Sequence, residues 1–77
     1  MNDNEMIFLD INQVLKKTSI GKSQLYKLIK QGMFPSQINL CGGKSVRWQK
    51  CDIEAWMFQQ VQAHRQTVAA SVALHVN

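Results

Sequence analysis

The chain has 77 residues, of which 45% are hydrophobic and 18% charged, and its formal net charge is +4. This length fits one small domain with a thin core, which argues against a deep catalytic cleft between lobes. The composition is globular rather than disordered. Because no secretory signal begins the chain and no apolar run is long enough to span a bilayer, we expect a cytoplasmic protein without a membrane partner.

The two cysteines, Cys41 and Cys51, indicate neither a disulfide framework nor a zinc site. No CxxC pair occurs, and His64 and His75 lie at gaps from the cysteines that match no familiar ligand spacing. Two thiols without a dense framework fit a reducing compartment. We therefore expect no metal ion and no cofactor.

In chain order, residues 1–6 are expected to be a flexible N-terminus. The apolar run at residues 6–9 predicts a short strand or an extended anchor. Asp10 offers an N-cap, and the apolar residues after it recur at helical spacing, which predicts a short helix ending near Lys17.

A turn at residues 18–21 and a second helix at about residues 22–31 follow. The apolar face of this helix consists of Leu25, Leu28 and Ile29. Gly32 stands where a left-handed C-terminal cap belongs, and Pro35 prevents the helix from continuing.

Alternating residues on both sides of a glycine turn predict a two-stranded hairpin. Its strands lie near residues 37–40 and 46–48, and residues 41–45 form its tip. Gly42 and Gly43 supply the positive φ angles that a tight reversal needs.

A third helix is predicted to start near Cys51 or Asp52. Its apolar stripe consists of Ile53, Trp56, Met57 and Val61. Residues 64–77 either extend this helix or form a mobile tail, with Val68 and Val72 in phase with Val61. We expect the large aromatic side chains to pack in the core rather than to stack on bases; these are Phe8, Phe34, Trp48 and Trp56.

Positive charge is concentrated in the middle of the chain. Eight of the nine Lys and Arg residues fall within residues 16–50, and no Asp or Glu occurs between Asp10 and Asp52. A polyanion surface favours such a segment, because each cation placed at a phosphate releases a counterion. A solvated basic face that improves solubility is the alternative.

Helix, short turn and helix in succession predict a helix-turn-helix, whose second helix enters the DNA major groove. Relative to the apolar face, the outward residues of that helix are donors and cations without an acid, whereas a merely solvated helix usually mixes charge signs. We therefore predict that this helix contacts DNA. The alternative is a helix that only packs against its neighbour and exposes its lysines to solvent. The predicted DNA-contacting residues are Lys22, Ser23, Gln24, Tyr26, Lys27 and Lys30.

The hairpin is a candidate wing because it directly follows the helix-turn-helix. Lys44, Ser45 and Arg47 place donors at its tip and on the return strand. A cation in the narrow minor groove meets enhanced negative potential. An ordinary glycine turn with scattered surface charge is the alternative.

No catalytic constellation is apparent. Asp52 and Glu54 are two residues apart on a helix, so they face different ways and form no acid–base pair. No Ser or Cys is placed with a plausible base, and both histidines lie in the C-terminal segment. We expect no enzymatic activity and no small-molecule substrate.

Five motifs in order resemble those of AlpA-type prophage regulators, within the excisionase-like and MerR-like winged helix-turn-helix domains. They are Phe8-Leu9, residues 21–27 (GKSQLYK, against "SRSTIYR" in the family), Gly32-x-Phe34-Pro35, residues 42–48 (GGKSVRW) and Asp52-Ile53-x-Ala55-Trp56. The resemblance runs from about Phe8 to Val61. It implies binding of prophage promoter or recombination-site DNA, with Lys22, Ser23, Gln24 and Lys27 at recognition positions and Lys44 at the wing tip.

The chain departs from this pattern at two helix starts. Gly21 and Cys51 stand where the family usually has Ser, so each helix loses a hydroxyl cap. Ser19 is expected to compensate at the second helix, and Asp52 or Gln49 at the third.

The sequence thus predicts an α+β, mainly helical fold: one winged helix-turn-helix at residues 7–63, followed by a tail or helix extension at residues 64–77. The predicted function is sequence-specific binding of double-stranded DNA as a prophage transcriptional regulator. Two alternatives are an excisionase-like directionality factor that bends DNA and a protein-interaction module that uses the apolar tail. Whether the chain forms a homodimer, with Val61, Val68 and Val72 as the contact, is left open.

Overall fold

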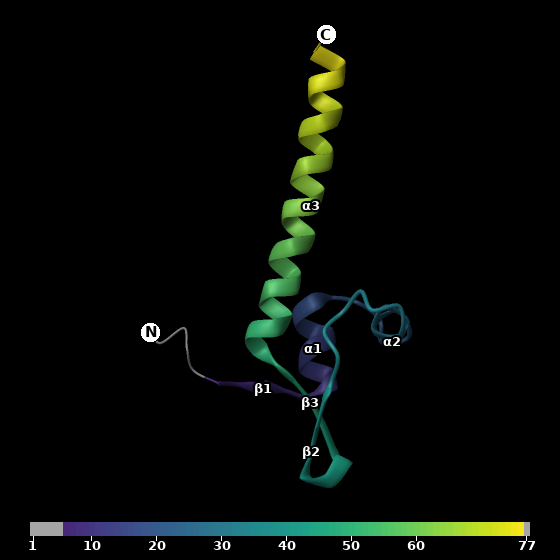
Figure 1. Cartoon of the computed structure of the whole chain (residues 1–77), viewed down its shortest axis with the longest axis vertical. Coiled ribbons are helices and arrows are strands. Elements are labelled where there is room, and N and C mark those ends of the chain that lie inside the picture. Colours follow the sequence, from purple (N-terminus) through teal and green to yellow (C-terminus); the bar gives the residue numbers. More distant parts are fainter. Residues whose placement is uncertain (1–5, 77) are drawn as a thin grey trace.

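The computed structural model describes the backbone of residues 6–76 and the side chains of residues 6–67, so most of the expected flexible N-terminus lies outside it. The described chain has an α+β fold with the architecture of a winged helix-turn-helix (Figure 1). Its elements are β1 (Phe8–Leu9), α1 (Ile11–Thr18), α2 (Lys22–Lys30), β2 (Ile38–Leu40), a 3₁₀ turn (Cys41–Gly43), β3 (Ser45–Gln49) and α3 (Lys50–Val76).

The start of α1 is held by a reciprocal capping box. The Asp10 carboxylate accepts a hydrogen bond from the Gln13 amide at 2.9 Å, and the Gln13 side chain accepts one from the Asp10 amide at 2.8 Å. The helix ends at Thr18, one residue later than predicted. Ser19 adopts a left-handed conformation with φ 61°, which begins the turn towards α2.

Helix α2 is fixed more firmly at its end than at its beginning. Gly21 precedes it without a side-chain cap, so the compensation expected from Ser19 does not occur. At the other end Gly32 has φ 73°, its amide bonds the Ile29 carbonyl, and the Met33 amide bonds the Leu28 carbonyl. These paired bonds form a Schellman motif, which confirms the C-terminal cap predicted at Gly32.

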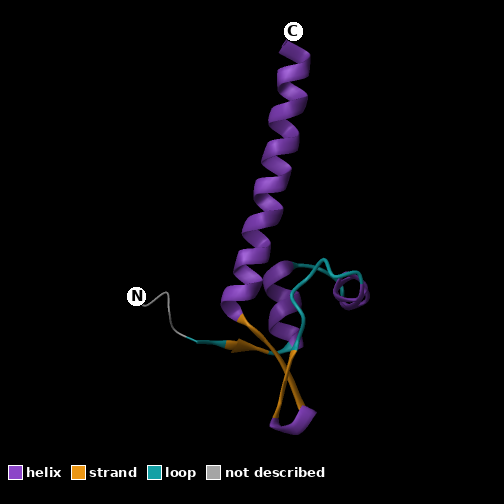
Figure 2. Ribbon diagram, viewed as in Figure 1, coloured by secondary structure: helices purple, strands orange, loops and turns teal. Residues whose placement is uncertain are grey.

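The three strands form one antiparallel sheet in the order β1-β3-β2. Strands β2 and β3 make the predicted hairpin, with Leu40 opposite Ser45 across its tip (Figure 2). Strand β1 pairs with the other end of β3, where Leu9 lies opposite Trp48. Strand β3 therefore lies between the other two strands and connects the N-terminal segment with the hairpin.

The core is small and draws one buried side chain from almost every element. Its buried members are Leu9, Val14, Leu25, Phe34, Trp48 and Ile53. Trp48 is 0% exposed, and its indole N–H donates to the Pro35 carbonyl at 3.1 Å, so the largest core side chain has no unmet donor. Leu28 and Ile29 pack against this cluster, as the predicted apolar face of α2 requires.

Two residues predicted to be internal are exposed. Phe8 is 45% exposed because neighbouring residues of a strand point to opposite sides, and Leu9 takes the inward position. Val61 is also 45% exposed, because α3 has left the core by that point. Met57 is therefore the last residue of the predicted apolar stripe of α3 that packs against the core.

Helix α3 begins at Lys50, just before the predicted start, and continues for 27 residues to Val76. Residues 64–76 thus extend the helix, one of the two predicted alternatives; the side chains of Val68 and Val72 lie outside the described residues. Figure 1 shows α3 leaving the other elements on the side opposite the hairpin. We call residues 6–57 the head and residues 58–76 the arm.

Candidate nucleic-acid interface

The outward side of α2 carries the predicted contact residues in exposed positions. Leu25, on the inward side, is 0% exposed, whereas Tyr26 next to it is 38% exposed. The exposed positions of the helix that were predicted to meet DNA are Lys22, Ser23, Gln24, Tyr26, Lys27 and Lys30. Both ion pairs among the described residues involve Glu54, and neither involves a lysine of α2. The cations of this helix thus have no carboxylate to neutralise them there.

The beginning of α2 leaves backbone donors available. The first amide bonded within the helix is that of Leu25, which donates to the Gly21 carbonyl at 3.0 Å. The amides before it belong to the first turn, which has no intrahelical acceptors, and no side chain caps them. The positive end of the helix dipole therefore lies in the same turn as the cationic residue Lys22.

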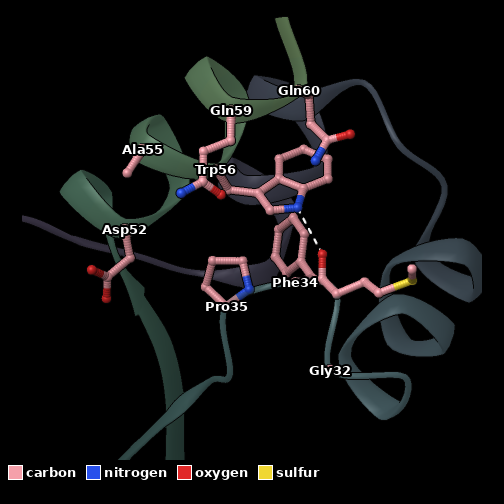
Figure 3. Close-up of a pocket in the computed structure, with 9 residues that line it drawn as sticks. Gly32, Phe34, Pro35, Asp52, Ala55, Trp56, Gln59 and Gln60 are labelled. Atoms are coloured by element: carbon pink, nitrogen blue, oxygen red, sulfur yellow. Dashed lines mark hydrogen bonds between the residues drawn. The ribbon is translucent and has the colours of Figure 1, made fainter. Parts of the chain in front are cut away.

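The end of α2 is tied to α3 by one aromatic side chain. The Trp56 indole N–H donates to the Met33 carbonyl at 2.8 Å, and the Trp56 ring meets the edge of Phe34 with centroids 4.7 Å apart (Figure 3). Sequence reasoning placed Trp56 in the core but missed this bond, because a helical stripe gives no information on the partner of the indole N–H.

An open cleft of about 580 Å³ lies beside this contact. It is lined by Gly32, Met33, Phe34, Pro35, Asp52, Ala55, Trp56, Gln59 and Gln60 (Figure 3). The lining contains an acid and no lysine or arginine, so the cleft is not part of the basic surface.

The hairpin presents Lys44 at its tip, while the other two predicted wing residues are less available. Lys44 is exposed, whereas Ser45 and Arg47 are half-buried. The Arg47 guanidinium donates one bond to the Val46 carbonyl at 2.8 Å. Figure 1 shows α2 and the hairpin as separate projections of the head, so the predicted residues form two groups rather than one patch.

Among the described cations outside these groups, Lys17 and Lys50 are partly neutralised by one carboxylate. The Glu54 carboxylate lies 3.0 Å from the Lys17 ammonium and 4.0 Å from that of Lys50. The hydrogen bond from Lys17, with the charges of both lysines, lowers the pKa of Glu54 below its ordinary value. Lys16, exposed in the last turn of α1, has no such partner among the described ion pairs. Sequence reasoning did not assign it, although the first helix of a helix-turn-helix crosses the phosphate backbone.

The one acid–thiol contact among the described residues is a long, exposed hydrogen bond of 3.9 Å that the Cys51 thiol donates to the Asp52 carboxylate. Glu54 contacts α1, whereas Asp52 lines the cleft, so the two carboxylates face different ways as expected. Both cysteines are free and exposed. Residues 6–67, whose side chains are described, contain no group of three or more His, Cys, Asp or Glu side chains that could hold a metal ion. Nor does any described helix have the length and apolarity needed to cross a bilayer.

Comparison with known proteins identifies the family. The sequence model described as "Prophage CP4-57 regulatory protein (AlpA)" matches residues 8–61. The chain is also 34% identical over 58 residues to "Uncharacterized protein ORF88" of Enterobacteria phage P4; this match covers 75% of the chain and 65% of that protein, just under two thirds of its length. No solved structure matches the chain. The chain therefore belongs to the AlpA family of prophage regulatory proteins.

Proposed function

We propose that this protein binds double-stranded DNA sequence-specifically as a prophage transcriptional regulator. Helix α2 lies in the major groove, and the hairpin contacts the adjacent minor groove or the backbone. The observation that carries the proposal is the exposed, acid-free outward side of α2, whose opposite side is fixed in the core through Leu25. Membership of a prophage regulatory family supports it.

The side chains of α2 offer both kinds of contact that specific binding requires. The Gln24 amide can bond adenine at two points, and the Lys27 ammonium can bond guanine or a phosphate. Ser23 and Tyr26 supply hydroxyl donors for phosphate oxygens. The uncapped first turn, beside Lys22, provides backbone amides for a further phosphate.

The wing adds charge at a second point on the duplex. Lys44 is its exposed cation, and the guanidinium of Arg47 keeps N–H groups beyond the one bonded to Val46. The left-handed residues at the tip, from Cys41 to Gly43, allow its backbone to approach a groove closely. Lys16, in the last turn of α1, contacts the phosphate backbone of the DNA in this arrangement.

The test is a salt titration of duplex binding by the wild-type chain and single variants. Lys27→Ala and Lys44→Ala should each weaken binding and make the plot of log affinity against log salt less steep, by about one unit for each lost phosphate contact. The matched control is Lys50→Gln, which removes one charge outside the proposed contact groups, at a lysine that already lies 4.0 Å from the Glu54 carboxylate, and should leave both quantities unchanged. An affinity flat in salt, or equal losses in all three variants, would contradict the proposal.

The binding site is found by footprinting the DNA around the gene. A site that overlaps a promoter, together with a change in transcript level, is the expected result. Mobility of permuted fragments that carry the site distinguishes this role from that of a recombination directionality factor, which bends its DNA.

A further inference from the structure

The arm is a helix without a described partner. The α3 residues that pack on the core are Ile53, Trp56 and Met57, all in the head. From Phe58 to Thr67, where side chains are described, every residue except Gln62 is exposed. At the usual rise, residues 58–76 extend about 28 Å beyond these contacts.

The composition of the arm is unlike that of a helix that stands alone in water. Arg65 is the only Lys, Arg, Asp or Glu between Ala55 and Asn77. No ion pair can therefore form between successive turns of the arm, although such pairs are what stabilises a fully solvated helix. An unpacked helix of this length is marginal in water, because most helical stability in proteins comes from tertiary packing.

One side of the arm has the chemistry of an interface. Phe58 is 63% exposed and Val61 is 45% exposed, and their i, i+3 spacing places them on the same side of the helix. Arg65, seven residues after Phe58, continues that side. Depletion of charge with an aromatic and an arginine is the composition found at the centre of protein–protein contacts.

We propose that the arm pairs with the arm of a second copy of this chain in a twofold dimer. The charge distribution selects this partner: eight of the nine cations fall within residues 16–50, so arm-to-arm pairing joins the least charged segments and keeps the basic heads apart. Arg65 favours antiparallel arms, because parallel arms would place the two guanidinium groups at the same level. The dimer does not depend on the proposed function; its use on DNA does, since two heads would read two half-sites in inverted orientation.

The dimer should be weak. Two helices about 28 Å long and about 10 Å wide, each with half of its side surface covered, bury roughly 900 Å² in total. This is below the usual area of stable complexes and resembles that of transient ones. We expect dissociation in the micromolar range in free solution, and a stronger assembly on DNA that carries both half-sites.

Sedimentation equilibrium without DNA tests the pairing directly. The full chain should show a reversible monomer–dimer equilibrium, and Phe58→Glu and Val61→Glu should each raise the dissociation constant at least tenfold. The matched control is Ala63→Glu, which adds the same charge to an exposed position on the opposite side of the helix and should still dimerise. Glu is a better helix former than Val or Phe, so the loss cannot be attributed to a broken helix.

Two results would overturn the proposal. One is a wild-type chain that stays monomeric at several hundred micromolar, and the other is Val61→Glu and Ala63→Glu variants that dimerise equally well. Binding to a duplex with one half-site distinguishes this failure from failure of the proposed function. A monomeric Val61→Glu variant should bind that duplex as the wild type does and lose only its preference for paired half-sites.

Discussion

The head and the arm differ in how their side chains pack and in how much charge they carry. In the head, β1, β3 and all three helices contribute to one small core, and nearly all of the charge of the chain covers its outside. In the arm, the helix continues without a described contact, and Arg65 is its only formally charged residue. Helix α3 belongs to both regions: it packs on the core up to Met57 and continues beyond it as the arm.

This difference shows that the two regions depend on different interactions for their order. The head is held by burial inside one chain, with Trp48, Val14 and Leu25 at 0% exposure. The described side chains of the arm, residues 58–67, lack such burial and would gain it by association. Changes of the same kind should therefore have unequal effects in the two regions, and the following predictions use that inequality.

The largest expected effect is on the core. Leu25→Ala should lower the free energy of unfolding by about 2–5 kcal/mol, because it removes buried methyl groups and leaves a cavity. Val61→Ala in the arm should change it by less than about 0.5 kcal/mol when measured at concentrations below dimer formation. Urea unfolding followed by tryptophan fluorescence measures both, since Trp48 and Trp56 lie in the head. Equal losses would show that the arm is part of the same cooperative unit.

A second pair of substitutions, one in the head and one in the arm, acts on the backbone conformation. Gly32→Ala should destabilise the head by about 1–2 kcal/mol, because an L residue at φ 73° is strained even though nothing crowds the new methyl group. Ala63→Gly in the arm weakens the helix by up to about 1 kcal/mol. It should reduce circular dichroism at 222 nm without moving the thermal midpoint of tryptophan fluorescence. A shift of that midpoint would show that the arm and the head unfold together.

The smallest effect concerns the junction of the two regions, where Glu54 of α3 contacts Lys17 of α1. The folded-state pKa of Glu54 is lowered from its ordinary 4.5, so the contact stabilises the head above that pH and is lost as the pH falls through the folded-state pKa. Glu54→Gln should make the fall of the unfolding midpoint in acid shallower. Lys17→Gln should do the same, and a wild-type profile in both variants would show that the contact contributes nothing.

Much of the head could be predicted from the sequence because local chemistry and apolar spacing agree there. The cap at Asp10, the left-handed Gly32 and the glycine turn at the hairpin tip each need a particular residue type, and all three lie where predicted. The exposed side of α2 followed from the positions of its apolar residues. The assignment of those exposed residues to DNA contact stays a prediction.

Other features depend on tertiary structure and gave no local signal. The two-residue strand β1 is too short for its alternation to show that Leu9 points inward and Phe8 outward. The apolar pattern of α3 continues past Met57, so the sequence could not show that the core ends there and Val61 is exposed. The pairing of Glu54 with Lys17 joins residues that are distant in the chain, and no sequence spacing predicts it.

The contact between Trp56 and Met33 determines where the protein can be shortened. This bond spans 23 residues, and it supplies the tertiary anchor for the segment that leaves α2. A fragment that stops before Trp56 would retain every residue predicted to touch DNA and lose the support that sets their angle to the groove. Truncation from the C-terminus should therefore leave binding to a single half-site unchanged until it reaches the cleft and abolish that binding beyond this point, even though no predicted DNA contact has been removed.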